Sequence, residues 1–239
     1  MEDTTTGLKQ KSPLSARDIG IRSYVVRSGR MTDMQKDALQ SLYPKYGLDW
    51  NPDLLLNEQA LFGTNGHPFI VEIGFGMGLA TADIAAALPD HRFLGLEVHA
   101  PGVGKLMSEM EKRTIRNIRI CRHDAVEVVD SMLAPDSVDG FHVFFPDPWP
   151  KKRHHKRRIM NQSFVALMSS RLKPGGYLYY VTDWEEYAER TLETMDAEPL
   201  LKNACERWAE RAPWRPVTKF EQRAINDGRP IRELRFVRV

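Results

Sequence analysis

The sequence predicts an α/β fold with a mostly parallel sheet, helices on both of its faces, and an antiparallel pair of strands at the C-terminal end. Three observations predict it. Short apolar segments alternate with helical segments between residues 67 and 195, a glycine-rich turn (GFGMG) follows the first apolar segment, and an acidic residue ends each of four successive apolar segments. Such βαβα alternation is typical of a parallel sheet with helical crossovers.

Length and composition suit one domain over residues 21–239, preceded by a polar tail over residues 1–20. A chain of 239 residues with 42% hydrophobic residues can bury a full core without disulfides or metals. Cys121 and Cys205 are far apart and match no metal-ligand spacing, so we expect reduced thiols and no metal site. The sequence shows neither the apolar core of a signal peptide nor a membrane-length apolar run, so we expect a cytoplasmic protein.

The first part of the chain contains one helix and the first βα unit. Thr32 is a typical cap for a helix over residues 33–42, which Pro44 helps to end. A strand over residues 67–73, a tight turn over residues 74–78 and an Ala-rich helix over residues 79–88 follow.

The alternation then continues to residue 195. In order, we expect a strand over residues 92–98, a helix over 104–114, a strand over 117–121, a helix over 125–132, a strand over 140–145, a helix over 162–172, a turn at KPGG, a strand over 177–181 and a helix over 184–195. Near the end, residues 226–228 (NDG) predict a hairpin turn into a final strand, which would give the antiparallel pair.

The glycine turn predicts a cofactor site. Gly74, Gly76 and Gly78 lie between a strand and its helix, where a ligand can approach the backbone. The spacing is GxGxG and not the GxGxxG of dinucleotide-binding proteins, and Glu72 just before it would repel a pyrophosphate, which disfavours a nicotinamide enzyme. An acid there suits the sulfonium and ammonium of S-adenosylmethionine. The structural alternative is a packing turn.

Three more acids follow successive strands. Glu97 is placed to accept the ribose hydroxyls of an adenosine, and Asp124 to accept from the adenine amino group. Each also has an ordinary interpretation, Glu97 as a solvated charge and Asp124 as a helix cap. Because Glu72, Glu97, Asp124 and Asp147 end four parallel strands, we expect them at one edge of the sheet, where open α/β sheets bind ligands.

The segment PDPWPKKRHHKRR combines a fixed carboxylate with a dense positive charge. Pro146 and Pro148 restrict the backbone around Asp147. Net charge is only +2, yet six of the 34 Lys and Arg residues and two His lie within residues 151–158, without an acid. Beside a candidate active site, this run favours phosphate binding over a solvated face. Trp149 either stacks on a base or packs at the lip of the pocket.

Six segments resemble one family. EIGFGMG, GLEVHAPGVG, HDAVEV, FFPDPWPKKRHHKRR, TDWEEYAE and RPVTKFEQR, in this order, closely resemble the bacterial tRNA (guanine-N7-)-methyltransferases over about residues 22–238. The resemblance implies a Rossmann-like class I methyltransferase fold, S-adenosylmethionine as cofactor and the guanine at tRNA position 46 as target. Without it, the residues indicate only a methyltransferase acting on RNA or DNA.

The resemblance also implies roles for individual residues. Glu72, Glu97, Asp124 and Asp147 would contact S-adenosylmethionine, and Asp147 would be the catalytic residue. The residues expected to meet the target nucleotide are Lys151, Asp183, Thr218, Lys219, Phe220 and Glu221. Those expected to touch RNA are Arg153, His154, His155, Lys156, Arg157 and Arg158. Without the resemblance, Asp183 would be a helix cap and residues 218–221 a surface turn.

Two other functions stay open at this point. PDPW is similar to the Asp/Asn-Pro-Pro-aromatic segment of amino-methyltransferases, although its prolines are interrupted by Asp147. A non-catalytic RNA-binding module on the same sheet is the other alternative, and it predicts no binding of S-adenosylmethionine. No long apolar helix face is left without a place against the sheet, so we expect a monomer.

Overall fold

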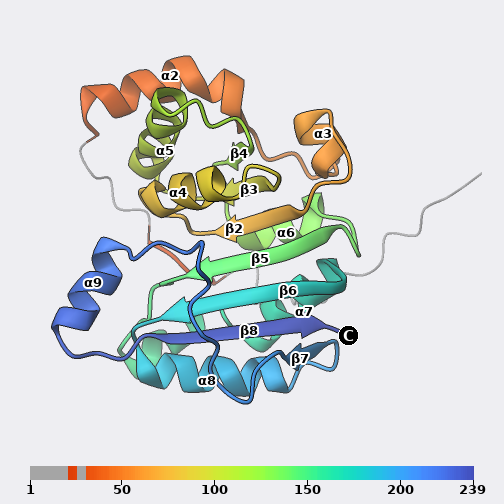
Figure 1. Ribbon diagram of the computed structural model, residues 1–239, viewed down its shortest axis with the longest axis vertical. Helices are drawn as coiled ribbons and strands as arrows, with labels where there is room; N and C mark the ends of the chain where they lie inside the picture. The colour runs from red at the N-terminus through yellow and green to blue at the C-terminus, as the bar shows by residue number, and fades with distance from the viewer. Residues whose placement is uncertain (1–20, 26–30) are drawn as a thin grey trace, which may run out of the picture.

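The computed structural model describes residues 21–25 and 31–239, so the expected tail over residues 1–20 lies outside the described part (Figure 1). Eight strands form one sheet in the order β1-β4-β3-β2-β5-β6-β8-β7. The strands are β1 (Gly47–Leu48), β2 (Phe69–Ile73), β3 (Arg92–Leu96), β4 (Ile118–Cys121), β5 (Val138–Phe144), β6 (Leu172–Thr182), β7 (Leu201–Asn203) and β8 (Arg232–Arg238). Pairs from β1 to β6 are parallel, and β8 is antiparallel to β6 and β7. This confirms the predicted fold class.

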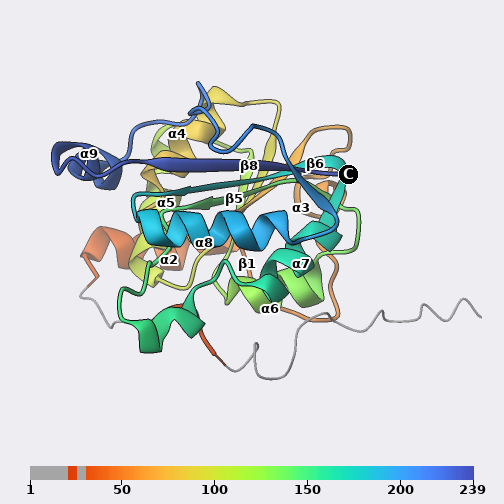
Figure 2. The ribbon, with the colours of Figure 1, turned by 90° about the horizontal axis from the view of Figure 1, so that it is seen from below.

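Helices cover both faces of the sheet (Figure 2). The helices are α2 (Asp33–Tyr46), α3 (Glu58–Phe62), α4 (Leu79–Ala87), α5 (Ala100–Lys112), α6 (Ala125–Met132), α7 (Gln162–Arg171), α8 (Glu185–Asp196), α9 (Lys219–Asn226) and the 3-10 helix η1 (Lys152–Arg157). On one face α4 and α5 pack on Phe93, and α2 packs on α5. On the other, α6, α7 and α8 pack on Leu94 and Phe141. None of the helices described is long and apolar enough to cross a membrane.

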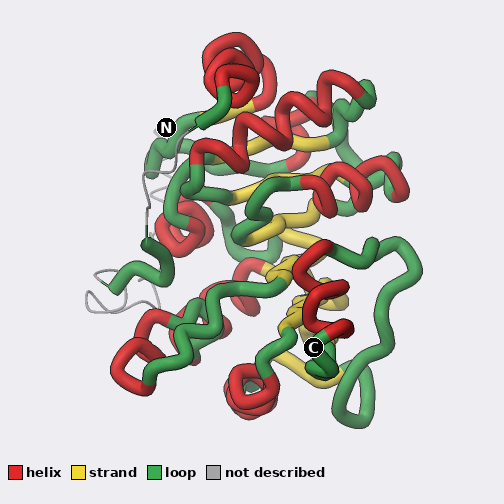
Figure 3. Tube along the Cα trace, turned by 90° about the vertical axis from the view of Figure 1, so that its left-hand side faces the viewer, coloured by secondary structure: helices red, strands yellow, loops and turns green. Residues whose placement is uncertain are grey.

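The strand order places two loops side by side at the edge of the sheet. β2 is paired with β3 on one side and with β5 on the other, so the chain reverses its direction of winding between β2 and β5. Open α/β sheets bind ligands at this switch point, beyond the carboxyl ends of the strands. Figure 3 looks onto this edge. The glycine turn after β2 and the PDPW segment after β5 both leave the sheet here.

Two helices differ from their predicted bounds. α2 continues through Pro44 to Tyr46, because Thr32 and Gln35 form a capping box at its start and only one internal hydrogen bond is lost at the proline. The predicted end before Pro44 is therefore wrong. α5 begins at Ala100 and not at residue 104, with Pro101 in its first turn, a position where proline's missing N–H costs nothing.

Two predicted turns are also wrong. KPGG lies inside β6, where the pairing with β5 shifts register and Gly175 takes a φ of 81°. Residues 226–228 make no hairpin: Asn226 is the last residue of α9, and Gly228, with a φ of 70°, ends that helix. The antiparallel pair exists, but β8 reaches β6 and β7 through long-range pairing that local turn chemistry does not encode.

Candidate active site at the carboxyl edge of the sheet

The glycine turn opens toward solvent and is packed from below. Gly76 has a φ of 58°, in the left-handed region that favours glycine, and a Cβ built there would meet no atom within 4 Å. Gly78 is the N-terminal cap of α4, and a Cβ there would lie 2.5 Å from the Cβ of Leu106. The turn thus leaves free space above its backbone, as a cofactor site requires.

Glu72 lies inside β2, directly before this turn. It is 3% exposed, and its Oε2 has no hydrogen-bond partner among the described residues. Burial raises the pKa of Glu72 to about 7; the nearby Thr81 hydroxyl opposes this rise, while the charge of Glu97 adds to it. A nearby cation would favour the ionised form of this carboxyl group.

Glu97 follows β3 and joins the end of that strand to the glycine turn. Its Oε2 accepts from the backbone N–H of Gly76 at 2.8 Å, and its Oε1 accepts from Val98 and His99 at 2.7 and 2.9 Å. A carboxylate has about four acceptor sites. Its Oε2 therefore retains capacity for a ribose hydroxyl, and the interpretation as a freely solvated charge does not describe this residue.

Asp124 caps α6, as its alternative interpretation predicted. Its side chain accepts from the N–H of Val126 at 3.0 Å, and it is 9% exposed. Burial raises its pKa. Tyr24, from the segment over residues 21–25, is next to it: burial and the charge of Asp124 raise the pKa of Tyr24. Tyr24 was not predicted to belong to the site, because neither its type nor its spacing distinguishes it from a packing residue.

Asp147 is exposed at the tip of a constrained loop. Phe145 and Trp149 flank the Pro-Asp-Pro core with φ of 50° and 46°, which is rare for bulky residues. Such strain persists only where surrounding contacts hold the backbone, and it is concentrated at functional sites.

Three hydrogen bonds hold this loop. The N–H of Phe145 donates to Val181 of β6 at 2.7 Å, and Trp149 Nε1 donates to the carbonyl of Ser23 at 3.0 Å. Arg158 Nε donates to the carbonyl of Pro148 at 2.8 Å. The loop is therefore tied to the sheet, to the segment over residues 21–25 and to the end of the basic run. Trp149 is partly buried and contacts Ser23, His154 and Arg157.

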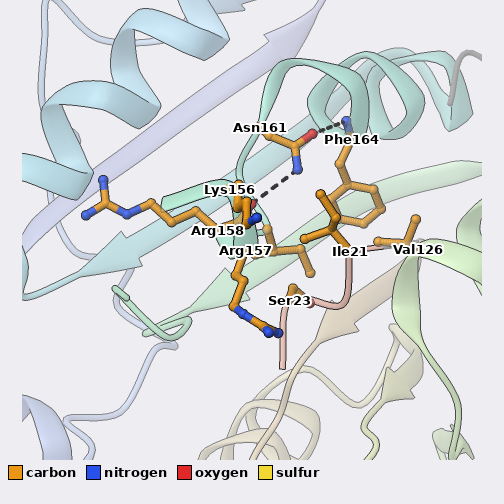
Figure 4. Close-up of a pocket in the computed structure, with 9 residues that line it drawn as sticks. Ile21, Ser23, Val126, Lys156, Arg157, Arg158, Asn161 and Phe164 are labelled. Carbon is orange, nitrogen blue, oxygen red and sulfur yellow. Dashed lines mark hydrogen bonds between the residues drawn. The ribbon is translucent and has the colours of Figure 1, made fainter. Parts of the chain in front are cut away.

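The basic run forms η1 beside this loop. Lys151 precedes η1, and it is exposed, as are Arg153 and Lys156. Arg157 donates to the carbonyl of Arg22 at 3.1 Å, and its guanidinium lies 5.3 Å from the ring centre of Trp149. Figure 4 shows the side chains of η1 and of the chain near Ser23 around one small cavity.

The two histidines of η1 are partly buried. The ring of His154 meets that of Trp149 edge-on, with centroids 5.7 Å apart. Burial and the surrounding Arg and Lys charges lower the pKa of His154. His155 Nε2 is buried and has no partner among the described residues.

Arg158 differs from the rest of the run. Its side chain is 2% exposed, and it binds Glu186 with two hydrogen bonds of 2.9 and 2.5 Å. The guanidinium also lies over Tyr187, 4.6 Å from the ring centre. Because its guanidinium is buried and its charge is paired, Arg158 is not accessible to RNA, which argues against the expectation that it touches RNA.

Asp183 follows β6 and pairs with Arg229. It does not cap α8: the N–H of Trp184 is taken by Thr182 Oγ1 at 3.2 Å, so the capping alternative is wrong. Its side chain is 23% exposed and stays reachable.

Residues 218–221 begin a helix and are not a surface turn. Thr218 caps α9 by accepting from the N–H of Glu221 at 3.0 Å. Lys219 and Phe220 are exposed, Phe220 by 68% of its surface. Figure 1 shows α9 projecting from the end of the sheet where β5 and β6 terminate.

Glu221 points inward, unlike its neighbours. Its carboxylate receives two hydrogen bonds from Arg215, at 2.7 and 2.9 Å, and Arg215 also donates to Glu233 at 2.6 Å. The Arg215 and Glu221 side chains are 1% and 3% exposed. This burial contradicts direct contact between Glu221 and a nucleotide.

Arg215 also connects α9 to the Asp147 loop. Burial alone would lower its pKa, but the hydrogen bonds to Glu221 and Glu233 outweigh burial and raise it. Its guanidinium lies 6.0 Å from the ring centre of Phe145. Arg215 was not among the predicted residues, because a lone arginine near a proline carries no local signal for a buried ion-pair network.

Comparisons with known proteins identify the family. Residues 66–234 match a family described as "Putative methyltransferase". The tRNA (guanine-N(7)-)-methyltransferase of Acidovorax sp. (strain JS42) is 52% identical over 92% of this chain and 86% of that protein. The enzyme of that name from Bordetella pertussis is 50% identical over 96% of this chain and 89% of that protein.

Solved structures share the fold. The aminoglycoside resistance methyltransferase NpmB1 aligns with a TM-score of 0.52 at 16% identity, over 80% of this chain and 95% of that one. A variant of the 16S rRNA (adenine(1408)-N(1))-methyltransferase from Catenulisporales acidiphilia aligns with a TM-score of 0.52 at 18% identity, over 80% of this chain and 93% of that one. The sequence similarity is decisive: this chain belongs to the tRNA (guanine-N7-)-methyltransferase family.

Proposed function

We propose that this protein transfers a methyl group from S-adenosylmethionine to N7 of the guanine at position 46 in the variable loop of tRNA. The observation that carries the proposal is the arrangement at the carboxyl edge of the sheet. A buried carboxyl group with an unpartnered oxygen, Glu72, lies below an open glycine turn, beside the constrained Asp147 loop and the basic η1. The names of the relatives supply the acceptor, N7 of guanine in tRNA.

The residues present fit S-adenosylmethionine. The cofactor brings a methyl group on a positively charged sulfur, and Glu72 and Asp147 place negative charge at the two loops that meet at the switch point. Glu97 retains acceptor capacity for the ribose, and Asp124 with Tyr24 provides polar groups for the adenine. The 16S rRNA methyltransferase of the same fold was solved with S-adenosylmethionine as its cosubstrate.

In this proposal the protein acts mainly by positioning. Guanine N7 carries a lone pair and no proton, so its attack requires no general base. Holding two reactants in line can supply on the order of 7 to 11 kcal/mol in the best model systems. Asp147 is suited to that role, because the strained backbone around it is fixed by three hydrogen bonds. Its carboxylate would also stabilise the positive charge that develops on the guanine ring.

The exposed side chains near the loop would hold the RNA. Lys151, Arg153 and Lys156 are free to meet phosphates, with Arg157 and the two histidines of η1 beside Trp149. Lys219 and Phe220, at the start of α9, and the partly exposed Asp183 after β6 would meet the target nucleotide. We further propose that residues 21–239 act as one domain and as a monomer, in the cytoplasm where tRNA is found.

The test is to incubate the protein with S-adenosylmethionine and unmodified tRNA transcripts, and to analyse the digested nucleosides by mass spectrometry. We expect 7-methylguanosine, and we expect it to disappear when position 46 is not guanine. Another methylated nucleoside would contradict the proposed acceptor atom. Absence of product together with absence of S-adenosylmethionine binding in a calorimeter would favour the non-catalytic alternative.

A further inference from the structure

A second positively charged groove lies at the other edge of the sheet. It is open, has a volume of about 600 Å³ and is lined by Arg92, Arg113, Arg116 and Arg119, with no Asp or Glu among its lining residues. Arg92 begins β3, and Phe62, the last residue of α3, forms part of the wall. Figure 1 shows α3 at the opposite end of the strands from α9. The groove is therefore separate from the candidate active site.

Arg92 and Arg119 have no carboxylate partner within the described part of the chain. Arg119 donates from Nη1 to the backbone carbonyls of Arg116 and Ile118, at 3.2 and 2.9 Å. A guanidinium has five N–H donors, so the donors on Nε and Nη2 of Arg119 remain for a ligand.

Arg92 makes more contacts inside the protein. Its Nη1 donates to the carbonyls of Pro89 and His91, at 3.1 and 3.2 Å, and its Nη2 lies 3.1 Å from His67 Nε2. None of these partners carries a negative charge. Arg92 therefore contributes mainly its charge to the groove, whereas Arg119 contributes both charge and free donors.

The other two arginines are paired. Arg113 binds Asp83 at 2.7 Å, and Arg116 reaches Glu111 at 3.4 Å. The groove therefore contains both neutralised and unneutralised guanidinium groups. The charges of Arg92 and Arg119 are the ones that no carboxylate of the described residues neutralises.

The two unneutralised guanidinium groups share one aromatic ring. Arg119 lies 4.6 Å and Arg92 lies 5.9 Å from the ring centre of Phe62. Arg119 is partly buried, and this burial lowers its pKa. A planar donor fork of this kind matches the oxygens of a phosphate.

We propose that this groove binds a phosphate of the RNA substrate, and that it forms a second anchor for tRNA away from the methylated base. The inference rests on the proposed function. The five residues of β3 span about 17 Å at ~3.3 Å each, so only a large polyanion could occupy this groove and the basic η1 at once. Contacts to phosphates position a nucleic acid without reading its sequence.

The test compares the salt dependence of tRNA binding for the full-length protein and for Arg92→Gln/Arg119→Gln. Each lost phosphate contact reduces the slope of log affinity against log salt by about 0.7 to 0.9. We expect a smaller slope and a higher KM for tRNA, with turnover at saturating tRNA unchanged. Arg119→Lys should retain the slope because it keeps the charge. Arg207→Gln, which removes an exposed arginine paired with Glu189, is the matched control.

Circular dichroism and the KM for S-adenosylmethionine establish that each variant is folded. If the double variant unfolds, Arg119→Gln alone is compared with Arg119→Lys. An unchanged slope in a folded variant would overturn the proposal.

A second arm separates RNA from free phosphate, using ³¹P NMR of inorganic phosphate with each variant. Binding of inorganic phosphate that depends on Arg119, together with an unchanged tRNA slope, would assign the groove to a free oxyanion and overturn the RNA anchor. If the wild-type protein does not methylate tRNA, the proposed function fails. In that case the salt dependence of tRNA binding and the binding of inorganic phosphate still test whether the groove binds RNA, because neither measurement depends on methyl transfer.

Discussion

Burial controls the charge of Glu72. Its pKa is about 7 in the folded protein, against an ordinary value near 4.5, so the native state holds a proton that the unfolded chain releases. Unfolding free energy should therefore fall as pH rises from about 4.5 to about 7, and Glu72→Gln should remove this part of the pH dependence. Urea unfolding of both proteins across this pH range measures the effect.

The same carboxyl group gives a prediction for cofactor binding. Since the sulfonium favours the ionised form, affinity for S-adenosylmethionine should rise with pH through about 7. Calorimetric titrations at about pH 6 and about pH 8 would show the rise in the wild type and a flatter profile in Glu72→Gln. Equal pH profiles for the two proteins would contradict a role for Glu72 in cation binding.

Asp147 is exposed and tied into a strained loop, so its replacement should affect catalysis more than stability. We expect Asp147→Asn to lower turnover by a factor on the order of 10² to 10³, the usual cost of removing one preorganised electrostatic group. Binding of tRNA and the melting temperature should be retained. Single-turnover methylation assays measure the effect, and near-normal turnover would remove Asp147 from the catalytic role.

Arg215 pairs with two buried carboxylates, so its replacement should mainly lower the stability of the folded protein. Arg215→Met leaves Glu233 without its arginine and Glu221 with only the longer contact to Arg211 at 3.7 Å, and breaking a buried pair typically costs about 3 to 5 kcal/mol. Urea unfolding measures this loss. Arg207→Met, at an exposed pair with Glu189, should cost at most about 1 kcal/mol. A similar loss of unfolding free energy in both variants would show that the buried ion pairs stabilise the protein no more than an exposed pair does.

At the scale of elements, the basic run over residues 151–158 combines two kinds of basic residue. Arg153, Lys156 and Arg157 lie toward solvent or the segment near Ser23, whereas Arg158, directly after η1, is buried against Glu186. Neutralising the first three together should reduce the salt dependence of tRNA binding, by about 0.7 per lost contact with single-stranded RNA.

Arg158→Gln provides the contrast within the same basic run. It should lower stability, because Glu186 and the carbonyl of Pro148 lose their donors, and it should leave the salt slope unchanged. Thermal melting and fluorescence anisotropy distinguish the two outcomes. If the triple variant keeps the salt dependence of the wild type, η1 does not bind RNA and is a solvated surface, as the alternative interpretation predicts.

Helices and strands with a regular hydrophobic pattern could be predicted from the sequence, whereas those that depend on pairing with a distant strand could not. The helix predicted over residues 125–132 has the same bounds as α6, because Asp124 caps it and its apolar face has helical spacing. KPGG has the composition of a turn but lies inside β6, at an irregularity where the pairing with β5 moves from Leu172 to Tyr177 and Gly175 takes a φ of 81°. β7 has three residues, too few to show a pattern.

At the scale of the whole molecule, the strand order assembles the site. Glu72, Glu97, Asp124 and Asp147 are spread over residues 72–147, yet the parallel pairing of β4, β3, β2 and β5 brings the loops that follow these strands to one edge. The same topology leaves the arginine groove at the opposite edge, so a bound tRNA would contact both ends of the sheet.

Residue patterns alone were enough to predict the fold class and the family, and to propose a cofactor role for the glycine turn and the four acids, because these features depend on local periodicity, glycine and proline chemistry and short motifs. Which charged side chains are available to a ligand could be seen only in the folded protein. Glu221 and Arg158 are buried against Arg215 and Glu186, and Asp124 lies near Tyr24 and caps α6. Ion pairing between distant residues depends on which surfaces the fold brings together, and residue type alone does not record that.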